Sequence, residues 1–262
     1  MTRRRLDAEL VRRKLVASRS AARDAIASGV VEVNGLVATK AASQVDEGVS
    51  IRFVGEPARF VSRGGLKLEA ALDTFCIDVA GRRALDIGAS TGGFTDCLLQ
   101  RGAARVVAVD VGYGQLDWQI RNDPRVDVHE RLNARHMDSA ALGGPFDVVV
   151  ADLSFISLRT VAGVLAAAGG PDADWVLLVK PQFEAGREQV GKGGIVRDVA
   201  VRAETLRNVI TTFEGEGLGA RGVTDSPIAG AKGNREFLLW LRREVTRVTV
   251  NDFGHLNGLT DA

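Results

Sequence analysis

Cysteine, histidine and tyrosine are scarce in this sequence, and long apolar runs are missing. Two cysteines, Cys76 and Cys97, stand in apolar surroundings with no metal-binding spacing, and they suggest no disulfide framework. Three scattered histidines offer no metal site. No run of about 18 apolar residues is present, so we predict no membrane span. The first residues are basic but lack an apolar core, so we expect no signal peptide. These absences favour a metal-free protein of a reducing compartment, the cytoplasm.

The charges are unevenly distributed along the chain, although the net charge is only +1. Residues 1–63 contain 12 Lys and Arg against 7 Asp and Glu, whereas the remainder contains 22 against 26. Such an asymmetry favours a nucleic-acid or membrane partner for the basic part. A helix whose basic side chains are simply solvated accounts for it equally well. The length of 262 residues suits one small and one large domain.

Residues 1–56 predict a small α+β domain. Leu6 and Leu10 recur at helical spacing, and a second helix is expected to stop at Gly29. The run V-V-E-V-N-G-L-V predicts two strands joined by a tight turn, because Asn-Gly is a strong hairpin signal. A third strand is expected at G-V-S-I-R-F. Residues 57–64, which contain proline and glycine, are expected to form a linker.

Residues 65–250 alternate between predicted strands and helices, a pattern typical of a mainly parallel, doubly wound α/β sheet. Strands are expected at residues 83–87, 105–110, 126–130, 146–151, 174–179, 219–224 and 235–241. Helices are expected within residues 93–101, 115–121, 156–168 and 199–214. The last two strands are separated by a short connection, so the last strand is expected to be antiparallel. Residues 251–262 are expected to form a loosely held tail.

Glycines follow the first strand of this domain in the sequence A-L-D-I-G-A-S-T-G-G-F-T, residues 84–95. They predict a strand, a tight turn and a helix, where a ligand can approach the backbone and the free N–H groups. The nicotinamide fingerprint G-x-G-x-x-G is not matched, because position 90 is serine. The pattern D-x-G-x-x-x-G-G resembles motif I of S-adenosylmethionine-dependent methyltransferases. A glycine turn without any ligand is the alternative.

The resemblance to motif I implies a binding site for S-adenosylmethionine. Asp110 ends the next apolar run, about 20 residues beyond the glycines, and suits a bidentate contact with the ribose hydroxyls. Val111 and Asn133 are expected beside the adenosine. Tyr113, the only tyrosine, either packs on the adenosine or is a structural aromatic. The turn and its flanks would contribute Asp86, Gly88, Ala89, Ser90, Thr91, Gly92, Gly93 and Phe94.

Four charged residues stand where the predicted sheet is expected to bind a ligand, at the carboxyl ends of its strands. Asp152 ends the run V-V-V-A-D, and Lys180 ends the run L-L-V-K. Glu236 opens the antiparallel last strand, so it returns to the same edge. Lys67, on a helix ahead of the first strand, is the least constrained. Ordinary surface ion pairs are the alternative reading, above all for Lys67 and Glu236.

Lys67, Asp152, Lys180 and Glu236 together resemble the K-D-K-E tetrad of ribose 2′-O-methyltransferases of the FtsJ (RrmJ) type. The motifs S-R-G-G-x-K-L, D-V-G-Y-G-Q-L, A-D-L-S-F-I-S-L, L-V-K-P-Q-F-E and G-N-x-E-F are similar to the TlyA family, historically called hemolysins. This resemblance extends over nearly the whole chain. It implies a Rossmann-like methyltransferase sheet of seven strands. It also implies 2′-O-methylation of cytidine in ribosomal RNA, within ribosomal subunits.

The basic N-terminal segment resembles the small RNA-binding domain first described in ribosomal protein S-four. The resemblance rests on the patterns S-R-S-x-A-x-x-A-I-x-x-G and V-x-V-N-G. That family binds structured RNA by shape and phosphate contacts, which fits a basic surface without stacking aromatics. Residues 182–194 of the large domain are expected to form a mobile loop on the substrate side. The candidate RNA contacts are Arg3, Arg4, Arg5, Arg12, Arg13, Lys14, Arg19, Arg23, Arg187 and Lys192.

The chemistry expected at the tetrad follows from the reacting groups. A ribose hydroxyl is a poor nucleophile, so transfer of a sulfonium methyl group needs in-line placement and removal of a proton. A lysine accepts that proton only in its neutral form, which burial and a nearby ammonium favour and a nearby carboxylate opposes. We expect Lys180 to be the base and Asp152 to hold it and face the sulfonium. Lys67 and Glu236 are expected to orient the hydroxyl.

Two other functions stay open at this stage. One is a membrane-active cytolysin, or hemolysin, which gains little support because no amphipathic basic helix with aromatic anchors is present. The other is a non-catalytic RNA-binding assembly factor that keeps the cofactor fold. Lysis of liposomes would indicate the first, and cofactor binding without methyl transfer would indicate the second.

Overall fold

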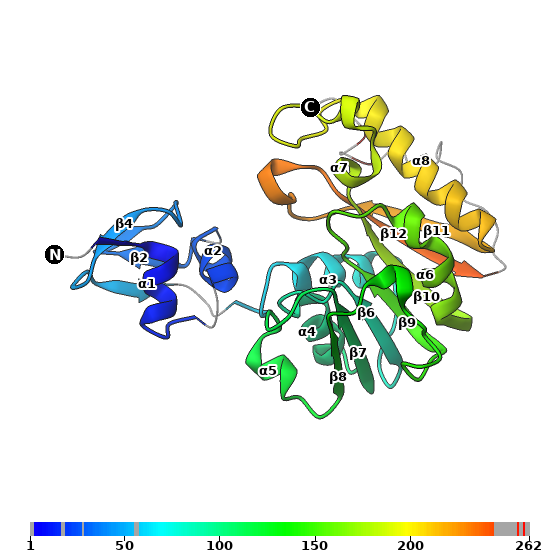
Figure 1. The fold of residues 1–262 in the computed structure, drawn as a ribbon, viewed down its shortest axis with the longest axis horizontal. Helices are drawn as coiled ribbons and strands as arrows, with labels where there is room; N and C mark the ends of the chain where they lie inside the picture. Colours follow the sequence, from blue (N-terminus) through cyan, green and yellow to red (C-terminus); the bar gives the residue numbers. More distant parts are fainter. Residues whose placement is uncertain are drawn as a thin grey trace.

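The structure is a computed structural model and describes residues 3–16, 19–27, 29–54 and 58–243, together with Leu256 and Leu259. Figure 1 shows a small N-terminal lobe beside a larger lobe that is built on one twisted sheet. The tail predicted at residues 251–262 lies outside the described residues, apart from Leu256 and Leu259. Both of these leucines pack against the core of the larger lobe.

The N-terminal lobe contains α1 (Leu6–Arg12), α2 (Arg19–Ala27), β1 (Arg3–Arg5), β2 (Val31–Val33), β3 (Leu36–Val37), β4 (Gln44–Asp46) and β5 (Ile51–Phe53). β3, β2 and β5 form one antiparallel sheet, and β1 pairs with β4, which the sequence did not predict. Asn34 and Gly35 have φ values of 51° and 79°, as a type I′ turn requires. The predicted hairpin between β2 and β3 is therefore confirmed. The buried core comprises Leu6, Leu10, Ala22, Ile26, Val31 and Val45.

The larger lobe is a seven-stranded mixed sheet with the strand order β11-β12-β10-β9-β6-β7-β8. Neighbouring strands from β10 to β8 run parallel, whereas β12 is antiparallel to both β10 and β11. The predicted doubly wound sheet with an antiparallel last strand is confirmed. Its strands are β6 (Arg83–Ile87), β7 (Arg105–Asp110), β8 (Val126–Glu130), β9 (Phe146–Ala151), β10 (Gly169–Val179), β11 (Leu218–Asp225) and β12 (Phe237–Arg243).

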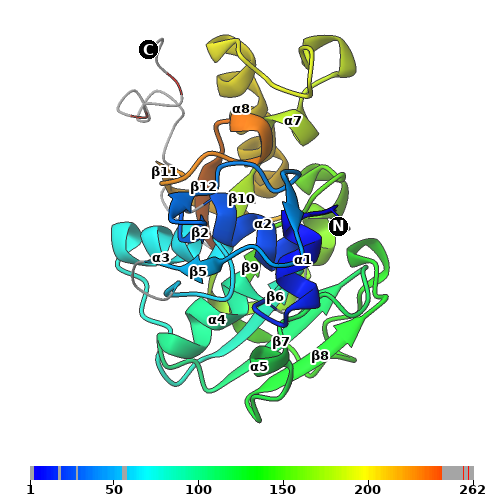
Figure 2. The same ribbon diagram turned by 90° about the vertical axis from the view of Figure 1, so that its left-hand side faces the viewer.

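Helices cover both faces of this sheet, as Figures 1 and 2 show. α3 and α4 pack on one face, and α6 and α8 pack on the other. The helices are α3 (Gly64–Phe75), α4 (Gly93–Gln100), α5 (Trp118–Arg121), α6 (Ala162–Ala168), α7 (Pro181–Glu184) and α8 (Val199–Gly215). Short 3-10 turns lie at η1 (Ala134–His136), η2 (Leu158–Val161), η3 (Arg187–Gln189) and η4 (Ala231–Gly233).

Alternate side chains of the central strands enter two separate cores, because successive residues of a strand face opposite sides of the sheet. Along β9, Val148 and Val150 pack with the side chains of α3 and α4. Val149 and Ala151 pack with those of α6 and α8. Burial on both faces explains why these strands are continuous apolar runs in the sequence.

Two predicted helices are shorter than expected, and one strand is longer. Of the helix expected at 115–121, only α5 forms, because Asp117 caps its start by accepting the Gln119 N–H over 2.8 Å. The segment expected as a helix at 156–168 begins with the 3-10 turn η2. β10 starts at Gly169, five residues early, and its pairing with β9 is irregular over this added stretch.

Residues 58–63, which fall in the predicted linker, contact the larger lobe. Phe60 is buried beside α3, where a Cβ at Gly65 would come within 2.3 Å of the Phe60 ring. The Val61 N–H donates to the Asp96 carboxylate in α4 over 2.8 Å. These contacts hold the segment against α3 and α4 as it approaches the site described next.

Candidate active site

The carboxyl ends of β6, β9 and β10 meet at one edge of the sheet. Ala151, the last residue of β9, pairs with Ile87 in β6 and with Leu177 in β10. Asp152 follows β9 directly, and Lys180 follows β10 directly. These two side chains therefore stand at neighbouring strand ends, at the edge where open α/β sheets bind their ligands.

Glu236 reaches the same edge from the opposite direction. β12 is antiparallel to β10, and its first residue, Phe237, pairs with Val179. Glu236 thus comes opposite Lys180 in the register of the sheet. Lys67 projects from the first turn of α3, and its Nζ donates to Glu236 Oε2 over 2.6 Å. The four charged residues singled out from the sequence gather at one place.

The glycine turn between β6 and α4 brings the backbone close to these residues. Gly88 and Gly92 have φ values of +86° and +97°, in the left-handed region that glycine adopts without strain. A Cβ at Gly88 would lie 2.6 Å from the carbonyl oxygen of Asp152, so a larger residue could not be accommodated unchanged. A Cβ at Gly93 would lie 2.3 Å from Ser62 Oγ. The turn is therefore packed tightly on both sides.

A cavity of about 590 Å³ lies beside this turn, a size suited to a nucleoside-sized ligand. Asp110 and Val111 line it from the end of β7, and Asn133 lines it from the start of η1. The Asp110 carboxylate accepts the N–H groups of Ser90 and Gly112 over 2.8 and 2.6 Å. These bonds fix the carboxylate in orientation and leave lone pairs for two hydroxyl donors.

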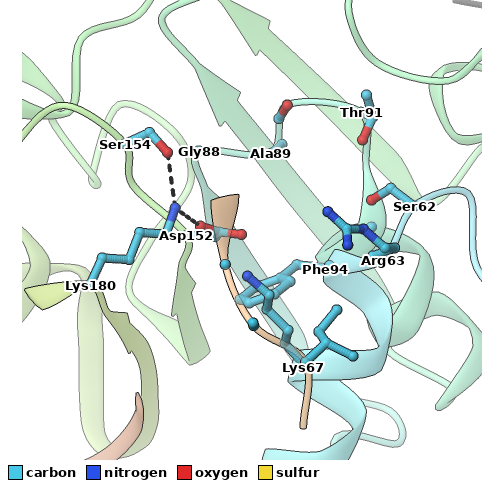
Figure 3. A pocket seen from close by; sticks show the side chains of 16 residues that line it. Ser62, Arg63, Lys67, Gly88, Ala89, Thr91, Phe94, Asp152, Ser154 and Lys180 are labelled. Atoms are coloured by element: carbon cyan, nitrogen blue, oxygen red, sulfur yellow. Dashed lines mark hydrogen bonds and ion pairs between the residues drawn. The ribbon is translucent and has the colours of Figure 1, made fainter. Parts of the chain in front are cut away.

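A smaller cavity of about 200 Å³ continues from the first one, because Gly88, Ser90, Asp152 and Ser154 line both. Figure 3 shows this cavity with Lys180 on one side of Asp152 and Lys67 on the other. Four more of the residues predicted at the cofactor line it: Ala89, Thr91, Gly93 and Phe94.

Two lysine–carboxylate pairs occupy this region. Lys180 forms an ion pair with Asp152 and also donates to Ser154 Oγ over 2.9 Å. Lys67 is paired with Glu236, as described above. Both lysines are 8% exposed, and Glu236 is 3% exposed. In the more deeply buried pair, Lys67 and Glu236, removing one partner would leave an uncompensated charge, which costs about 3–5 kcal/mol, so each of these two residues holds the other in place.

Three residues predicted at the cofactor line neither of the two cavities. Gly92 forms the start of α4, and Tyr113 is 68% exposed with the Arg131 guanidinium 4.3 Å from its ring centre. Asp86 is buried beneath the turn and accepts the Thr95 hydroxyl over 2.6 Å. Burial raises the pKa of Asp86 to about 7, against the opposing effect of the Thr95 hydrogen bond. Asp86 and Gly92 therefore act on the shape of the turn.

Three residues of the site were not singled out from the sequence. Ser154 lines both cavities, and Phe155, 92% exposed with a φ of 63°, lines the larger one. Gln182 donates to Glu236 Oε1 over 3.3 Å. Ser154 and Gln182 lie three residues beyond the ends of β9 and β10, and Phe155 lies four beyond β9. All three also stand within the motifs A-D-L-S-F-I-S-L and L-V-K-P-Q-F-E, so position and motif were the available signals.

Arginines of the N-terminal lobe converge on a buried aspartate. Asp7 is 0% exposed and pairs with Arg5, Arg19 and Arg23 at 2.9, 3.0 and 3.6 Å. The hydrogen bond from Arg5 is the main cause that holds the pKa of Asp7 well below its ordinary value, against the effect of burial. Three cations around one anion leave this surface positively charged.

A buried glutamate organises a second group of arginines. Glu9 pairs with Arg12 and Arg13, both at 2.7 Å, and with Arg4 at 4.0 Å. The hydrogen bond from Arg12, more than any other contact, lowers the pKa of Glu9 to about 2. Arg3 pairs with an aspartate of β4 at 3.3 Å. The other predicted RNA contacts, Lys14, Arg187 and Lys192, are exposed.

The part of the chain that the structure describes contains no helix long and apolar enough to cross a membrane. Within the same described ranges, no group of three or more His, Cys, Asp or Glu is arranged to hold a metal ion. The largely parallel sheet with its antiparallel β12, the glycine turn with its two joined cavities and the acidic residue at the end of β7 together are those of S-adenosylmethionine-dependent methyltransferases.

Comparison with known families narrows this class. Residues 60–243 match the FtsJ-like methyltransferase family, and residues 4–51 match the S4 domain. The first match covers well over half of the chain. The chain therefore belongs to the FtsJ-like methyltransferase family, and the predicted resemblances of both its segments are confirmed.

Individual relatives resemble the chain over nearly its full length. The 16S/23S rRNA (cytidine-2′-O)-methyltransferase TlyA of Mycobacterium tuberculosis is 53% identical over 246 residues, which is 94% of this chain and 92% of that protein. Hemolysin A of Brachyspira hyodysenteriae is 45% identical, over 84% of this chain and 92% of that protein. The solved structure of a candidate hemolysin from Streptococcus thermophilus has a TM-score of 0.75 and 40% identity, over 94% of this chain and 91% of that one.

Proposed function

We propose that this protein transfers the methyl group of S-adenosylmethionine to the 2′-oxygen of a cytidine in ribosomal RNA, presented within a ribosomal subunit. One observation carries the proposal: two lysine–carboxylate pairs meet at a cavity that continues the cofactor cavity, and Lys67, Lys180 and Asp152 line it. The relative from Mycobacterium tuberculosis, named for cytidine-2′-O-methylation of 16S and 23S rRNA, supports the choice of substrate. A ribosomal substrate would place the activity in the cytoplasm.

The residues of the two cavities fit S-adenosylmethionine. Asp110 would accept the ribose hydroxyls, with Val111 and Asn133 beside the adenosine. The turn at Gly88 would hold the methionine part, since a Cβ there would fill the gap between the turn and Asp152. When bound, S-adenosylmethionine supplies a methyl group on a sulfonium, which is a strong electrophile. Bound S-adenosylmethionine would span the opening between the two cavities.

Lys180 is the base in this proposal. In its neutral form it accepts the proton of the ribose 2′-hydroxyl as the oxygen becomes bonded to carbon. Asp152 holds Lys180 through the ion pair and presents a negative charge to the region where both cavities meet. After the transfer, the carboxylate stabilises the ammonium that Lys180 has become. The pair therefore supports the charge that develops on the base side.

Lys67 and Glu236 act on the 2′-oxygen of the ribose and not on the proton that it loses. Glu236 binds Lys67 at 2.6 Å and is held in turn by Gln182 at 3.3 Å. This arrangement fixes the Lys67 ammonium on the side of the small cavity opposite Lys180 (Figure 3). A donor fixed there would orient the hydroxyl and stabilise negative charge on its oxygen, as preorganised donors do in other enzymes.

The N-terminal lobe would bind the RNA backbone. Its arginines surround two buried carboxylates, which hold the guanidinium groups in set orientations, and guanidinium groups suit phosphate oxygens. We assign RNA binding to residues 1–56, methyl transfer to residues 65–250, and the connection to residues 57–64. Arg187 and Lys192 would contact RNA beside the active site.

Methyl transfer to ribosomal subunits tests the function. Purified protein is incubated with S-adenosylmethionine labelled in the methyl group and with subunits from a strain that lacks the modification. The RNA is then digested to nucleosides and analysed by mass spectrometry. We expect 2′-O-methylcytidine. A methylated base, or cofactor binding without any transfer to either subunit, would contradict the proposal, and the second result would favour an assembly factor.

A further inference from the structure

Neighbouring groups occupy most of the bonding directions of the Lys180 amine. An amine nitrogen is tetrahedral, and one direction of Lys180 Nζ is the bond to Cε. A second points to Ser154 Oγ over 2.9 Å, and the Asp152 carboxylate lies beside the amine as its ion-pair partner. With Asp152 in the third direction, one direction remains for the small cavity, which Lys180 lines and where the acceptor oxygen would lie.

Ser154 itself is held by a second set of contacts. The loop that carries it turns sharply at Phe155, whose φ of 63° is rare for a bulky side chain. Beyond that turn, the Ser157 hydroxyl donates to Glu184 Oε2 over 2.5 Å, and the Leu158 N–H donates to Glu184 Oε1 over 2.7 Å. Glu184 is 6% exposed. The loop is therefore fastened to α7 by a buried carboxylate.

The same short helix also fixes the lysine. Lys180 is the residue immediately before α7, and its carbonyl accepts the Phe183 N–H over 2.8 Å. α7 thus begins at the base and ends at Glu184, which holds the Ser154 loop. The distance between Ser154 and Lys180 is set from both sides by one four-residue element. The contact between Ser154 and Lys180 is therefore held in place by α7 and by the buried Glu184.

We propose that Ser154 is a positioning residue for the base, an inference that rests on the proposed function. In neutral Lys180, Asp152 and Ser154 each accept one N–H, so the lone pair has to occupy the remaining direction, toward the 2′-hydroxyl. As the C–O bond forms, the hydroxyl proton moves to that lone pair and the C–S electron pair stays on sulfur. Without Ser154, the amine rotates about the Cε–Nζ bond and its lone pair points at the acceptor only part of the time.

The expected effect is on the chemical step alone. Ser154 is not needed for the loop anchor at Glu184, and its side chain is exposed, so Ser154→Ala should keep the fold. Loss of alignment at a reacting group lowers a rate by up to about 100-fold. We expect the single-turnover rate at saturating S-adenosylmethionine to fall about 10- to 100-fold. Ser154→Thr, which restores a hydroxyl, should recover most of the rate.

The test compares Ser154→Ala, Ser154→Thr and, as a matched control, Ser139→Ala, whose hydroxyl lies outside both cavities. Binding of S-adenosylhomocysteine by calorimetry should be unchanged within about twofold in all three. The inference would be overturned if Ser154→Ala kept the full rate, or if Ser154→Thr were as slow as Ser154→Ala. Either result would leave the wild-type activity, and with it the proposed function, untouched.

A crystal structure of Ser154→Ala gives a readout that does not depend on activity. We expect the Lys180 amine to leave its place between Asp152 and position 154, or to lose a single position there. An amine in its original place would overturn the inference. Wild-type protein that fails to methylate ribosomal RNA would instead remove the proposed function, so the two failures are distinguishable.

Discussion

Replacing Gly230 by alanine should disable the active site without touching any charged residue. Gly230 lines the small cavity, and a Cβ placed on it would lie 1.9 Å from Glu236 Oε1 and 2.3 Å from the carboxylate carbon. Real Cβ contacts essentially never fall below 3.0 Å, so the carboxylate has to move by about 1 Å or more. Because the carboxylate is the far end of a flexible side chain, the chain can fold around this change.

The displaced carboxylate cannot keep its bonds to both Lys67 and Gln182. A misplacement of about 1 Å at a positioning group can cost about 100-fold in rate, so we expect kcat to fall by roughly 10- to 100-fold in Gly230→Ala. The affinity for S-adenosylmethionine should be nearly unchanged, because the predicted adenosine contacts lie in the other cavity. The unfolding temperature should change by less than about 4 °C, equivalent to 1–2 kcal/mol in a chain of this size.

Single-turnover methylation of ribosomal subunits measures this effect. Gly215→Ala is the matched control, because a Cβ there meets nothing within 4 Å and the backbone is helical. In the double variant Gly230→Ala with Glu236→Asp, the shorter acidic side chain should relieve the overlap with the new Cβ. The rate of the double variant should therefore fall by less than the product of the two single-variant reductions. A wild-type rate in Gly230→Ala would refute the reasoning.

Three further predictions follow from other parts of the molecule. Asp110→Ala should weaken S-adenosylmethionine binding about 10- to 100-fold in calorimetry, since hydrogen bonds to a charged group contribute about 1.5–3 kcal/mol; an unchanged Kd would contradict this. The pKa of Asp86 is raised to about 7, so the folded state retains this proton and the wild type loses stability as pH rises from about 4 to 7. Asp86→Asn should therefore gain thermal stability relative to wild type as the pH rises from about 4 to 7, whereas a constant difference over this range would argue against ionisation of Asp86. Arg23→Ala should reduce the slope of log K against log salt concentration for RNA by about 0.7–0.9, and an identical slope would remove Arg23 from the RNA contacts.

The central strands could be predicted because their burial on both faces leaves a plain signal. β6, β7 and β9 have the predicted bounds, since each is a largely apolar run that ends at, or directly before, a polar residue or glycine. β8 also has the predicted bounds, although it is an edge strand that is only partly buried. β10 could not be bounded from the sequence. Its first residues, Gly169 to Asp172, are polar or small and join the sheet only through an irregular pairing with β9.

The members of the proposed active site could be named from the sequence, and so could the pairing of Lys180 with Asp152, but the pairing of Lys67 with Glu236 could not. The end of a predicted strand can be read directly from the sequence, and it placed Asp152 and Lys180 correctly at the sheet edge. The partner of Lys67 depends on where α3 crosses the sheet, and Glu236 lies 169 residues away along the chain. Ser154 belongs to no motif of charged residues, and only the fold shows its contact with Lys180.

The basic N-terminal segment illustrates a similar limit. Its arginines are evident from the sequence, yet they read as independent surface charges. The structure buries Asp7 and Glu9 among them, so the arginines form two organised groups. Acidic residues in a basic helix give no sign that they are buried, because the helical periodicity alone would equally allow them to face the solvent.

The central claim is that the Lys180 amine removes the proton from the acceptor hydroxyl. Its most direct test is the single-turnover rate of Lys180→Ala on unmodified ribosomal subunits at saturating S-adenosylmethionine, with cofactor binding measured in parallel. General-base catalysis contributes about 100- to 10,000-fold, so the account predicts a fall of that size with the cofactor still bound. A variant that binds the cofactor and forms 2′-O-methylcytidine at the wild-type rate would contradict it.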